Sequence, residues 1–550
     1  MSKKCLSCDV KFDLTKQELS LLKKMDLPEP KLCPTCRSQR RWVMRNQSKL
    51  FKRKCDFTGK EIVSLYTPDS KHKVYKEDIW WSDKWDAMDY GRDFDFSRPF
   101  FEQFKELQLD VPRRGMHQDG TSENCEYTTF GMNNKDCYLA FACFGCENVY
   151  YSTWAMMSRE SIDCLLPMNS ELVYECIHCL NSYKCFYCKN CNQCTECYLI
   201  EDCNNCQNCI GCKNLANKKY YIYNKESTKE EYEKLKDRIE KDGFKDEKEK
   251  FDKWKLTQPT RYAHIINSQN CDGDYIYNGK NCHNCFGVLA QGAEDSCNCH
   301  MTGAQAKEVM DCNMSGAGSE LIYEMQATTA GYMSAFVNFC KFSKYVYYCD
   351  SISNCENCFG CVGLKNQQFC IFNKQYSKEE YNKLKNRIID HMKKTGEWGE
   401  NFPSTNSPFP YNHTLAQDYF PLDKAQARKL GYPWHDDEQS VVSKKTSKKL
   451  EKNIAKINES ILEEVLTCEN CSKDYRIIPQ ELRLYKILKV AIPSECPDCR
   501  YNRKMKEFSR TKLYERKCMN KNCDNKFKTI YTQKDPEIVY CESCYQKIVI

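Results

Sequence analysis

Pairs of cysteines separated by two residues occur near both ends of the chain. Cys5 and Cys8 are followed, after 24 residues, by Cys33 and Cys36, and the arrangement returns near the other end. Each C-x2-C pair presents two sulfurs from one tight turn, and two pairs supply the four thiolates of a tetrahedral zinc site. The predicted ligands of the first two zinc sites are Cys5, Cys8, Cys33, Cys36, Cys468, Cys471, Cys496 and Cys499.

A third group of cysteines follows the C-terminal copy. Its predicted ligands are Cys518, Cys523, Cys541 and Cys544, which brings the expected cofactor content to about three Zn²⁺ per chain. The matching segment behind the N-terminal copy keeps only Cys55, where VYKEDI at 74–79 replaces VYCESC at 539–544. We therefore interpret Cys55 as a small buried residue without metal.

The two terminal modules are copies related by an offset of 463 residues, and a basic run follows each. Residues 37–54 carry eight cationic side chains and no acidic one, with Trp42 and Phe51 among them. Such a segment suits phosphate contacts and base stacking, whereas a helix that packs on its own ribbon is the alternative. The predicted nucleic-acid contacts, to RNA or DNA, are Arg37, Arg40, Arg41, Arg45, Arg53, Arg500, Arg503, Lys504 and Arg516.

Between these modules the chain repeats every twelve residues from Ser122 to about Asn224. One column is mostly small, the next mostly apolar, and a third holds turn-forming asparagines. A short period with such columns is typical of a β-solenoid, in which each unit covers its neighbour's apolar face. The columns are Cys125, Cys137, Val149, Ser161, Val173, Cys185, Cys197 and Cys209; Tyr138, Tyr150, Ile162, Tyr174, Phe186, Tyr198 and Ile210; and Asn133, Gly145, Met157, Asn169, Asn181, Gln193, Asn205 and Asn217.

The width of one coil stays open at this point. Inward cysteines such as Cys185, Cys188, Cys191 and Cys194 would suit a narrow coil of one unit, whereas inward aromatic residues would need a wider one. We favour two units per coil.

The array recurs at an offset of 149, because SELVYE at 170–175 returns as SELIYE at 319–324. The second copy counts in twelves from Cys285 to Cys297 and Val309, with one extra residue before Ile322. Capping boxes at Ser227 with Glu230 and at Ser377 with Glu380 predict a helix after each array. A further helix within 97–114 is expected to cover the first coil of the first array.

The predicted fold is mainly β: a tandem β-solenoid with capping helices, flanked by zinc ribbons at both ends. The domains are a zinc ribbon with its basic segment at 1–54, a degenerate ribbon and capping helix at 55–121, the first array at 122–226, a capping helix and arm at 227–260, the second array at 261–376, a capping helix and wrapping tail at 377–440, a charged helix or linker at 441–467, the second ribbon and basic segment at 468–517, and the third zinc site at 518–550.

Composition bounds the compartment. The chain of 550 residues holds 41 cysteines, yet its start lacks an apolar signal core, and no stretch of about twenty apolar residues exists that would span a bilayer. We therefore expect reduced thiols, a cytoplasmic location and no membrane association. A net charge of +7 is modest for this length and does not select a partner.

Three function classes remain. The first is a non-enzymatic zinc protein, a rigid solenoid scaffold whose ribbons bind nucleic acid or whose surface binds a protein partner. The second is a thiol-rich metal or redox protein acting through the solenoid cysteines, although Val149 and Ser161 occupy the same column and favour core filling. The third is a β-helix enzyme using carboxylates such as Glu123, Glu147 and Glu171, which recur every 24 residues.

The segment LTKQELSLLKKMDLPEPKLCPTCR, with the cysteine pair before it, resembles a small bacterial family of zinc-ribbon domains with the signature C-x2-C…P-x-x-C-x2-C-R. The whole layout, including KCDFTGK, IFNKQYSKEEY and FPLDKAQARKLGY, is similar to Cys-rich proteins of candidate-phyla bacteria. The resemblance implies zinc ligation by the two terminal cysteine sets and implies no activity.

Overall fold

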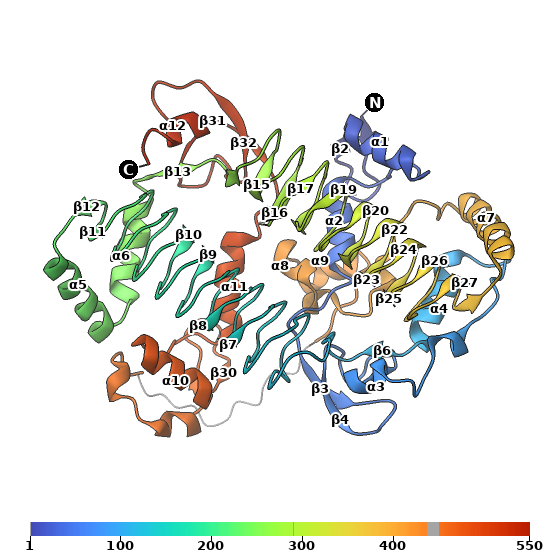
Figure 1. Ribbon diagram of the computed structural model, residues 1–550, viewed down its shortest axis with the longest axis horizontal. Coiled ribbons are helices and arrows are strands. Elements are labelled where there is room, and N and C mark those ends of the chain that lie inside the picture. The colour runs from blue at the N-terminus through green and yellow to red at the C-terminus, as the bar shows by residue number, and fades with distance from the viewer. Residues whose placement is uncertain (1, 290, 437–449, 550) are drawn as a thin grey trace.

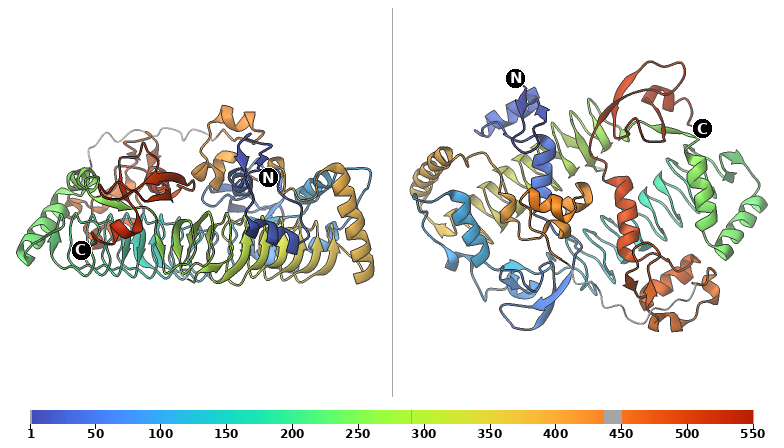
Figure 2. Two further views of the ribbon diagram at one scale, coloured as in Figure 1. Left: turned by 90° about the horizontal axis from the view of Figure 1, so that it is seen from above. Right: turned by 180° about the vertical axis from the view of Figure 1, so that it is seen from behind.

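The computed structural model describes residues 2–289, 291–436 and 450–549. It combines short strands with helices: two arrays of stacked strands lie side by side, and the terminal modules sit on one side of them (Figures 1 and 2). The largest sheet has eight strands in the order β17-β19-β20-β22-β24-β26-β27-β28, and only the β27–β28 pair is antiparallel. Among the described residues, no helix combines the length and apolar character that a membrane crossing needs.

The elements before the first array are β1 (Lys3–Lys4), β2 (Lys11–Phe12), α1 (Lys16–Lys24), α2 (Pro34–Trp42), β3 (Phe51–Lys54), β4 (Glu61–Ser64), β5 (Val74–Tyr75), α3 (Glu77–Trp81), η1 (Ala87–Tyr90), α4 (Phe100–Asp110) and β6 (Arg113–Arg114). The first array and the helices after it contain β7 (Glu147–Tyr150), β8 (Arg159–Ile162), β9 (Ile177–Leu180), β10 (Lys189–Asn192), β11 (Tyr221–Ile222), β12 (Lys225–Glu226), α5 (Lys229–Asp242), α6 (Lys245–Lys255) and β13 (Pro259–Arg261).

The second array contains β14 (Ile265–Ile266), β15 (Gly273–Tyr277), β16 (Cys285–Val288), β17 (Ala293–Glu294), β18 (His300–Thr302), β19 (Ala306–Met310), β20 (Glu320–Tyr323), β21 (Gln326–Thr329), β22 (Tyr332–Ala335), β23 (Asn338–Lys341), β24 (Lys344–Tyr347), β25 (Asp350–Ser353), β26 (Glu356–Phe359), β27 (Gln368–Ile371) and β28 (Lys374–Gln375). The rest of the chain contains α7 (Lys378–Thr395), η2 (Ser404–Asn406), η3 (Tyr411–His413), α8 (Leu415–Tyr419), α9 (Lys424–Lys429), η4 (Ile454–Lys456), η5 (Glu459–Glu463), β29 (Leu466–Thr467), β30 (Asp474–Tyr475), α10 (Pro479–Leu488), α11 (Pro497–Phe508), β31 (Tyr514–Lys517), β32 (Lys526–Thr529), β33 (Ile538–Tyr540) and α12 (Glu542–Tyr545).

Neighbouring layers of the first array are one repeat apart. Glu123 pairs in parallel with Lys135, and Lys135 in turn pairs with Glu147, so each partner lies twelve residues on. The expectation of two units per coil is therefore wrong. One unit closes a layer because small side chains, and not the aromatic column, fill its interior.

The interior is filled by every third residue. Cys185, Cys188, Cys191 and Cys194 are all at most 1% exposed. A thiol in this position has two backbone partners: Cys176 Sγ lies 3.3 Å from the carbonyl oxygen of residue 174 and 3.2 Å from that of residue 185. Because a thiol is small and a weak donor, it fills the narrow layer while contacting these buried carbonyls.

Inward N–H groups need acceptors as well. The Cys137 N–H donates to Cys125 Sγ at 3.4 Å, and the Ser182 N–H donates to Ser170 Oγ at 3.1 Å, each one layer back. Cysteine and serine therefore share these positions because both supply a small acceptor.

Each group of three residues consists of a residue that pairs with the next layer, a corner residue and an inward residue. The corner residue has a left-handed backbone. Along the predicted asparagine column φ is 54° at Asn133, 49° at Asn181 and 57° at Asn217. The Asn205 amide donates to Asn217 Oδ1 at 2.7 Å and the Asn169 amide to Asn181 Oδ1 at 3.3 Å, so the predicted ladder forms in part of the column. Left-handed corners also occur at every third residue around it, a feature that the twelve-residue reading missed.

The aromatic column points outward and is covered by helices. Tyr174, Phe186 and Tyr198 are at most 3% exposed, in a core shared with α5, α6 and α10. The Tyr198 and Tyr232 ring centroids lie 6.5 Å apart, and those of Tyr174 and Tyr485 lie 6.1 Å apart. The predicted arm is thus part of this cover.

The second array has the predicted extra residue, since Val309 pairs with Ile322 thirteen positions on. Phe286 pairs with His300, so this step spans fourteen residues and the predicted twelve from Cys285 to Cys297 is wrong. Later layers return to steps of twelve, as in Cys358 with Cys370.

The helix predictions hold with two corrections. Ser377 and Glu380 form the predicted capping box, but the first box consists of Thr228 and Glu231, because Ser227 Oγ donates instead to the carbonyl of Tyr220. Helix α4 forms, yet it lies on the last layers of the second array, where Phe100 packs against Phe359 and Phe372. It does not cover the first coil of the first array.

Of the predicted linker at 441–467, residues 441–449 lie outside the described residues. The short helices η4 and η5 follow in the rest of it.

His264 joins the two arrays. Its Nε2 lies 2.9 Å from Asp202 Oδ1 of the first array, and its Nδ1 lies 3.1 Å from Asp274 Oδ1 of the second. Burial opposes the charged form, but Asp274 and Asp202 outweigh it and raise the pKa of His264 to about 9.

This ion pair predicts a pH dependence. A group whose pKa is raised on folding stabilises the protein fully below its unfolded pKa of 6.5, and the stabilisation is lost as the pH rises through about 9. We expect a loss of roughly 3 kcal/mol across this window. Thermal unfolding from pH 6.5 to 9.5 measures it, with His264→Gln as the reference. If the stability of both proteins fell equally with rising pH, His264 would not be the group responsible.

Candidate metal centres

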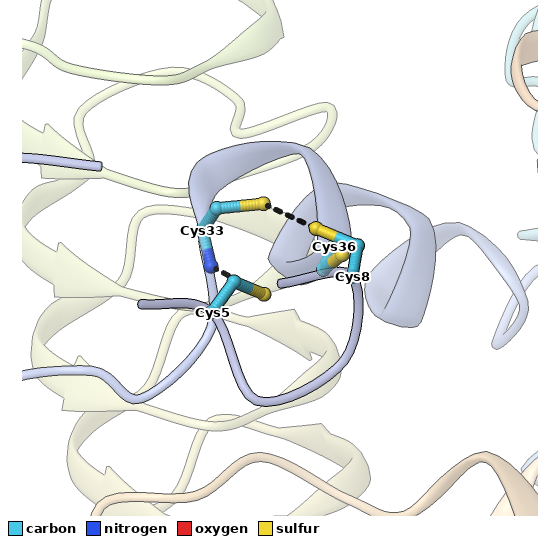
Figure 3. Close-up of side chains that lie close together, drawn as sticks. All are labelled: Cys5, Cys8, Cys33 and Cys36. Atoms are coloured by element: carbon cyan, nitrogen blue, oxygen red, sulfur yellow. Dashed lines mark hydrogen bonds between the residues drawn. The ribbon is translucent and has the colours of Figure 1, made fainter. Parts of the chain in front are cut away.

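The structure brings each predicted set of four cysteines together. Within each set the four sulfur atoms all lie within 4.8 Å of one another. In the first set, Cys5 and Cys8 lie on the β1–β2 turn, Cys33 is the N-cap residue of α2, and Cys36 follows in its first turn (Figure 3). Pro34 at the first helical position fixes the turn that presents the second pair.

The second set repeats this geometry. The Cys33 N–H donates to Cys5 Sγ at 3.2 Å, and the Cys496 N–H donates to Cys468 Sγ at the same distance. The third set is built differently, from the β31–β32 hairpin and the N-terminus of α12, but the equivalent N–H···S contact at Cys541 recurs at 3.3 Å.

Sulfur spacing within the sets fits a tetrahedral ion. Cys8 and Cys33 Sγ are 3.7 Å apart, as are Cys523 and Cys541 Sγ. A Zn–S distance of about 2.3 Å gives a tetrahedron with edges of roughly 3.8 Å. The Cys36 thiol, through its hydrogen bond, lowers the pKa of Cys33 to about 5.

The degenerate hairpin behind the first ribbon keeps the hairpin of the third set but only one of its four cysteines. Strands β3 and β4 pair as β31 and β32 do. Cys55 is 1% exposed, and its Sγ accepts the N–H of Lys76, the residue that replaces Cys541. Cys55 is therefore a buried core residue, as predicted.

Most side chains of the first basic run point into the protein. Arg37 is fully buried, with its guanidinium 2.7 Å from Asp311 of the second array. Arg40 contacts Glu324 at 3.0 Å, and Arg41 lies 3.5 Å from the same carboxylate. Helix α2 thus packs on the second array through these side chains, while Arg37 also contacts its own ribbon, at Glu18 and at the carbonyl of Leu32.

The second basic run makes the same contacts with the other array. Arg500 lies 2.9 Å from Asp163, Arg503 lies 3.0 Å from Glu175, and Lys504 lies 3.3 Å from Glu175. The three remaining predicted contacts are also held internally. Arg45 stacks on Phe130, Arg53 donates to the carbonyl of Thr67, and Arg516 donates to the carbonyl of Thr532.

The two terminal modules make equivalent contacts, each with the array that is farther from it in the sequence. The N-terminal module binds the second array and the C-terminal module binds the first (Figure 1). Burial raises the pKa of Asp311 to about 6, in opposition to Arg37 and Arg41. Burial likewise disfavours charge on Glu324, but Arg40 and Arg41 outweigh it and lower the pKa of this carboxyl.

Sequence reasoning missed the acidic partners Asp163, Glu175, Asp311 and Glu324. A signal existed, because Asp163 and Asp311 are 148 residues apart, and Glu175 and Glu324 are 149 apart, close to the repeat offset. Carboxylates that recur at the repeat offset beside an apolar column indicate a buried partner.

The other sequence hypotheses concern the arrays themselves. Within the described residues, the groups of three or more side chains placed to hold a metal are the three cysteine sets, and none is built from array cysteines. Glu123, Glu147 and Glu171 stack in one column with Lys135 and Arg159 between them, so the charges alternate.

A comparison with protein-family models found none that matches the chain, and a search of curated proteins found no match either. Fold and site together define a Cys-rich protein with parallel strands and three four-cysteine groups compatible with metal binding, zinc included.

Proposed function

We propose that the chain is a non-enzymatic zinc protein in which two β-solenoids, residues 122–226 and 261–376, form a rigid scaffold. Three Zn²⁺ ions hold the small terminal modules folded, and the modules clamp the solenoids through buried arginine–carboxylate pairs. The observation that carries the proposal is the presence of three four-cysteine groups whose sulfur atoms all lie within 4.8 Å of one another, as four ligands of one ion must.

Zinc is favoured because four thiolates in a closed tetrahedron select zinc or iron, and such closed sites are structural. The array thiols do not support the metal-storage alternative, since they contact backbone groups. The carboxylates that suggested an enzyme, Glu123, Glu147 and Glu171, alternate with basic residues along their column, which does not support the enzyme alternative.

Nucleic-acid binding stays a prediction without its original support, because the arginines that suggested it form internal contacts. Salt-dependent RNA binding by the full chain would test it.

Metal analysis of the natively purified chain tests the zinc proposal. Inductively coupled plasma mass spectrometry should find three zinc ions and no iron per chain. Ten or more metal ions per chain, or iron in stoichiometric amount, would establish the thiol-rich alternative instead.

A further inference from the structure

A cavity of about 520 Å³ lies between the two arrays, away from the cysteine sets. Its walls come from both arrays and from the segment that contains Trp80, Trp81 and Arg114. The volume falls in the range of small-molecule sites, about 300–1,000 Å³. Nothing in the scaffold proposal uses this space.

The cavity lies where two columns of corner residues, one in each array, contain an alanine between larger side chains. In the first array Ala142 stands between Phe130 and Trp154, one layer away on each side, and all three line the cavity. In the second array Ala327 stands between Met314 and Phe339 in the same way. Each column therefore leaves a gap one large side chain deep, and both gaps open into the same space.

The lining suits a flexible apolar chain. It includes six methionines, whose unbranched side chains adapt to ligands of varying shape. These residues are Met132, Met156, Met157, Met168, Met301 and Met314.

The lining of this apolar cavity includes a buried cation, Arg45. Arg45 is 2% exposed, stacks 3.7 Å above the Phe130 ring, and makes one side-chain hydrogen bond, to Gln47. Among the described residues no carboxylate oxygen lies within 4.0 Å of its guanidinium, unlike Arg37 or Arg500. A buried guanidinium without a counter-ion is costly, so an anionic ligand would be stabilised there.

The other charges around the cavity do not cancel Arg45. Arg114 lies 3.7 Å from Glu77, and Lys341 and Asp119 complete the charged lining, which leaves one surplus positive charge. His117 accepts a hydrogen bond from Arg114 and stays neutral, because burial lowers its pKa.

Trp154 offers a second unmatched donor. Its indole Nε1 is buried and has no hydrogen-bond partner in the part of the chain that the structure describes. It lies two layers from Phe130 along one column, roughly 10 Å away by the usual strand spacing. Within the described ranges the Trp154 indole N–H has no acceptor and the Arg45 guanidinium has no carboxylate partner, and a carboxylate or an adjacent oxygen of a ligand would supply both.

We propose that this cavity binds an amphipathic monoanion, a long-chain carboxylate, with its head at Arg45 and its alkyl chain among the methionines. The scaffold thereby carries a small-molecule site that is independent of its zinc ions.

Binding of palmitate to the zinc-loaded full chain tests the inference, measured by equilibrium dialysis with labelled palmitate. We expect one molecule per chain. Ala327→Phe fills the gap with the residue type that Phe339 already provides one layer on, and it should abolish binding. The matched control is Ala330→Phe, a corner position outside the cavity whose neighbour one layer on is Phe342, and it should bind normally.

The head group is tested with the uncharged analogue. Arg45→Gln should weaken palmitate binding by roughly tenfold or more, the loss expected for a charge-assisted hydrogen bond, and leave hexadecanol binding unchanged. Absence of palmitate binding, or equal binding by the Ala327→Phe variant with zinc content retained, would overturn the inference. Preference for hexadecanol over palmitate would overturn the role of Arg45.

Discussion

Replacing Arg37 with methionine should lower the free energy of unfolding by about 3–5 kcal/mol. The side chain is fully buried, and its loss leaves Asp311, which is also fully buried, without its closest cation. The Arg41 guanidinium stays 3.7 Å away and compensates only in part. Chemical denaturation of the zinc-loaded chain measures the effect, with hydrogen exchange in α2 showing where it acts.

The control for this variant is Arg428→Met on the exposed face of α9, which should change stability by less than about 0.5 kcal/mol. Adding Asp311→Asn to Arg37→Met should recover part of the loss, because the carboxylate closest to the missing guanidinium then carries no charge, although Glu18, 3.6 Å from Arg37, still loses its partner. A loss below about 1 kcal/mol for the single variant would mean that the buried pair does not clamp the module.

The cysteine sets were the part of the site that the sequence predicted best. Four ligands in two C-x2-C pairs form a local pattern, because each turn is built from adjacent residues such as Cys5 and Cys8. Duplication strengthened the inference, since Cys468 and Cys471 repeat the pattern at the same offset. All three sets form as predicted.

The repeat period was also predicted, but the size of a layer was not. The twelve-residue columns align in space, as Lys135 with Glu147 shows. The error came from placing the aromatic column inside, since tyrosine can be buried equally well beneath a helix such as α5 or α10. Cysteine at every third position, from Cys185 to Cys197, carried the information about a narrow interior.

The basic runs could not be assigned from their composition. A buried arginine and a phosphate-binding arginine look alike until the partner is known, and the partner of Arg37 lies 274 residues away in the chain. The same distance hides the cavity, whose two walls belong to different arrays. Contacts of this kind depend on how two repeats pack together, and neither repeat specifies them alone.

Replacing Cys518 with serine should remove one zinc ion per chain and unfold the third module. In our proposal the module is too small to build a sufficient core, and the bound Zn²⁺ would supply most of its folding free energy, on the order of 10 kcal/mol or more. Hydrogen exchange should accelerate through β31, β32 and β33. It should also accelerate in β13, because Thr260 pairs with Val539 of β33 in parallel.

The duplicated hairpin provides the matched control. Cys55 occupies the position equivalent to Cys518 and is equally buried, yet it has no partner cysteines within the described residues. Cys55→Ser should therefore keep three zinc ions and leave exchange in β3 and β4 nearly unchanged. Three zinc ions in the Cys518→Ser protein would show that the third set is not a metal site. A lost zinc ion with β33 still protected would show instead that the packing of this module on β13 stabilises it without metal.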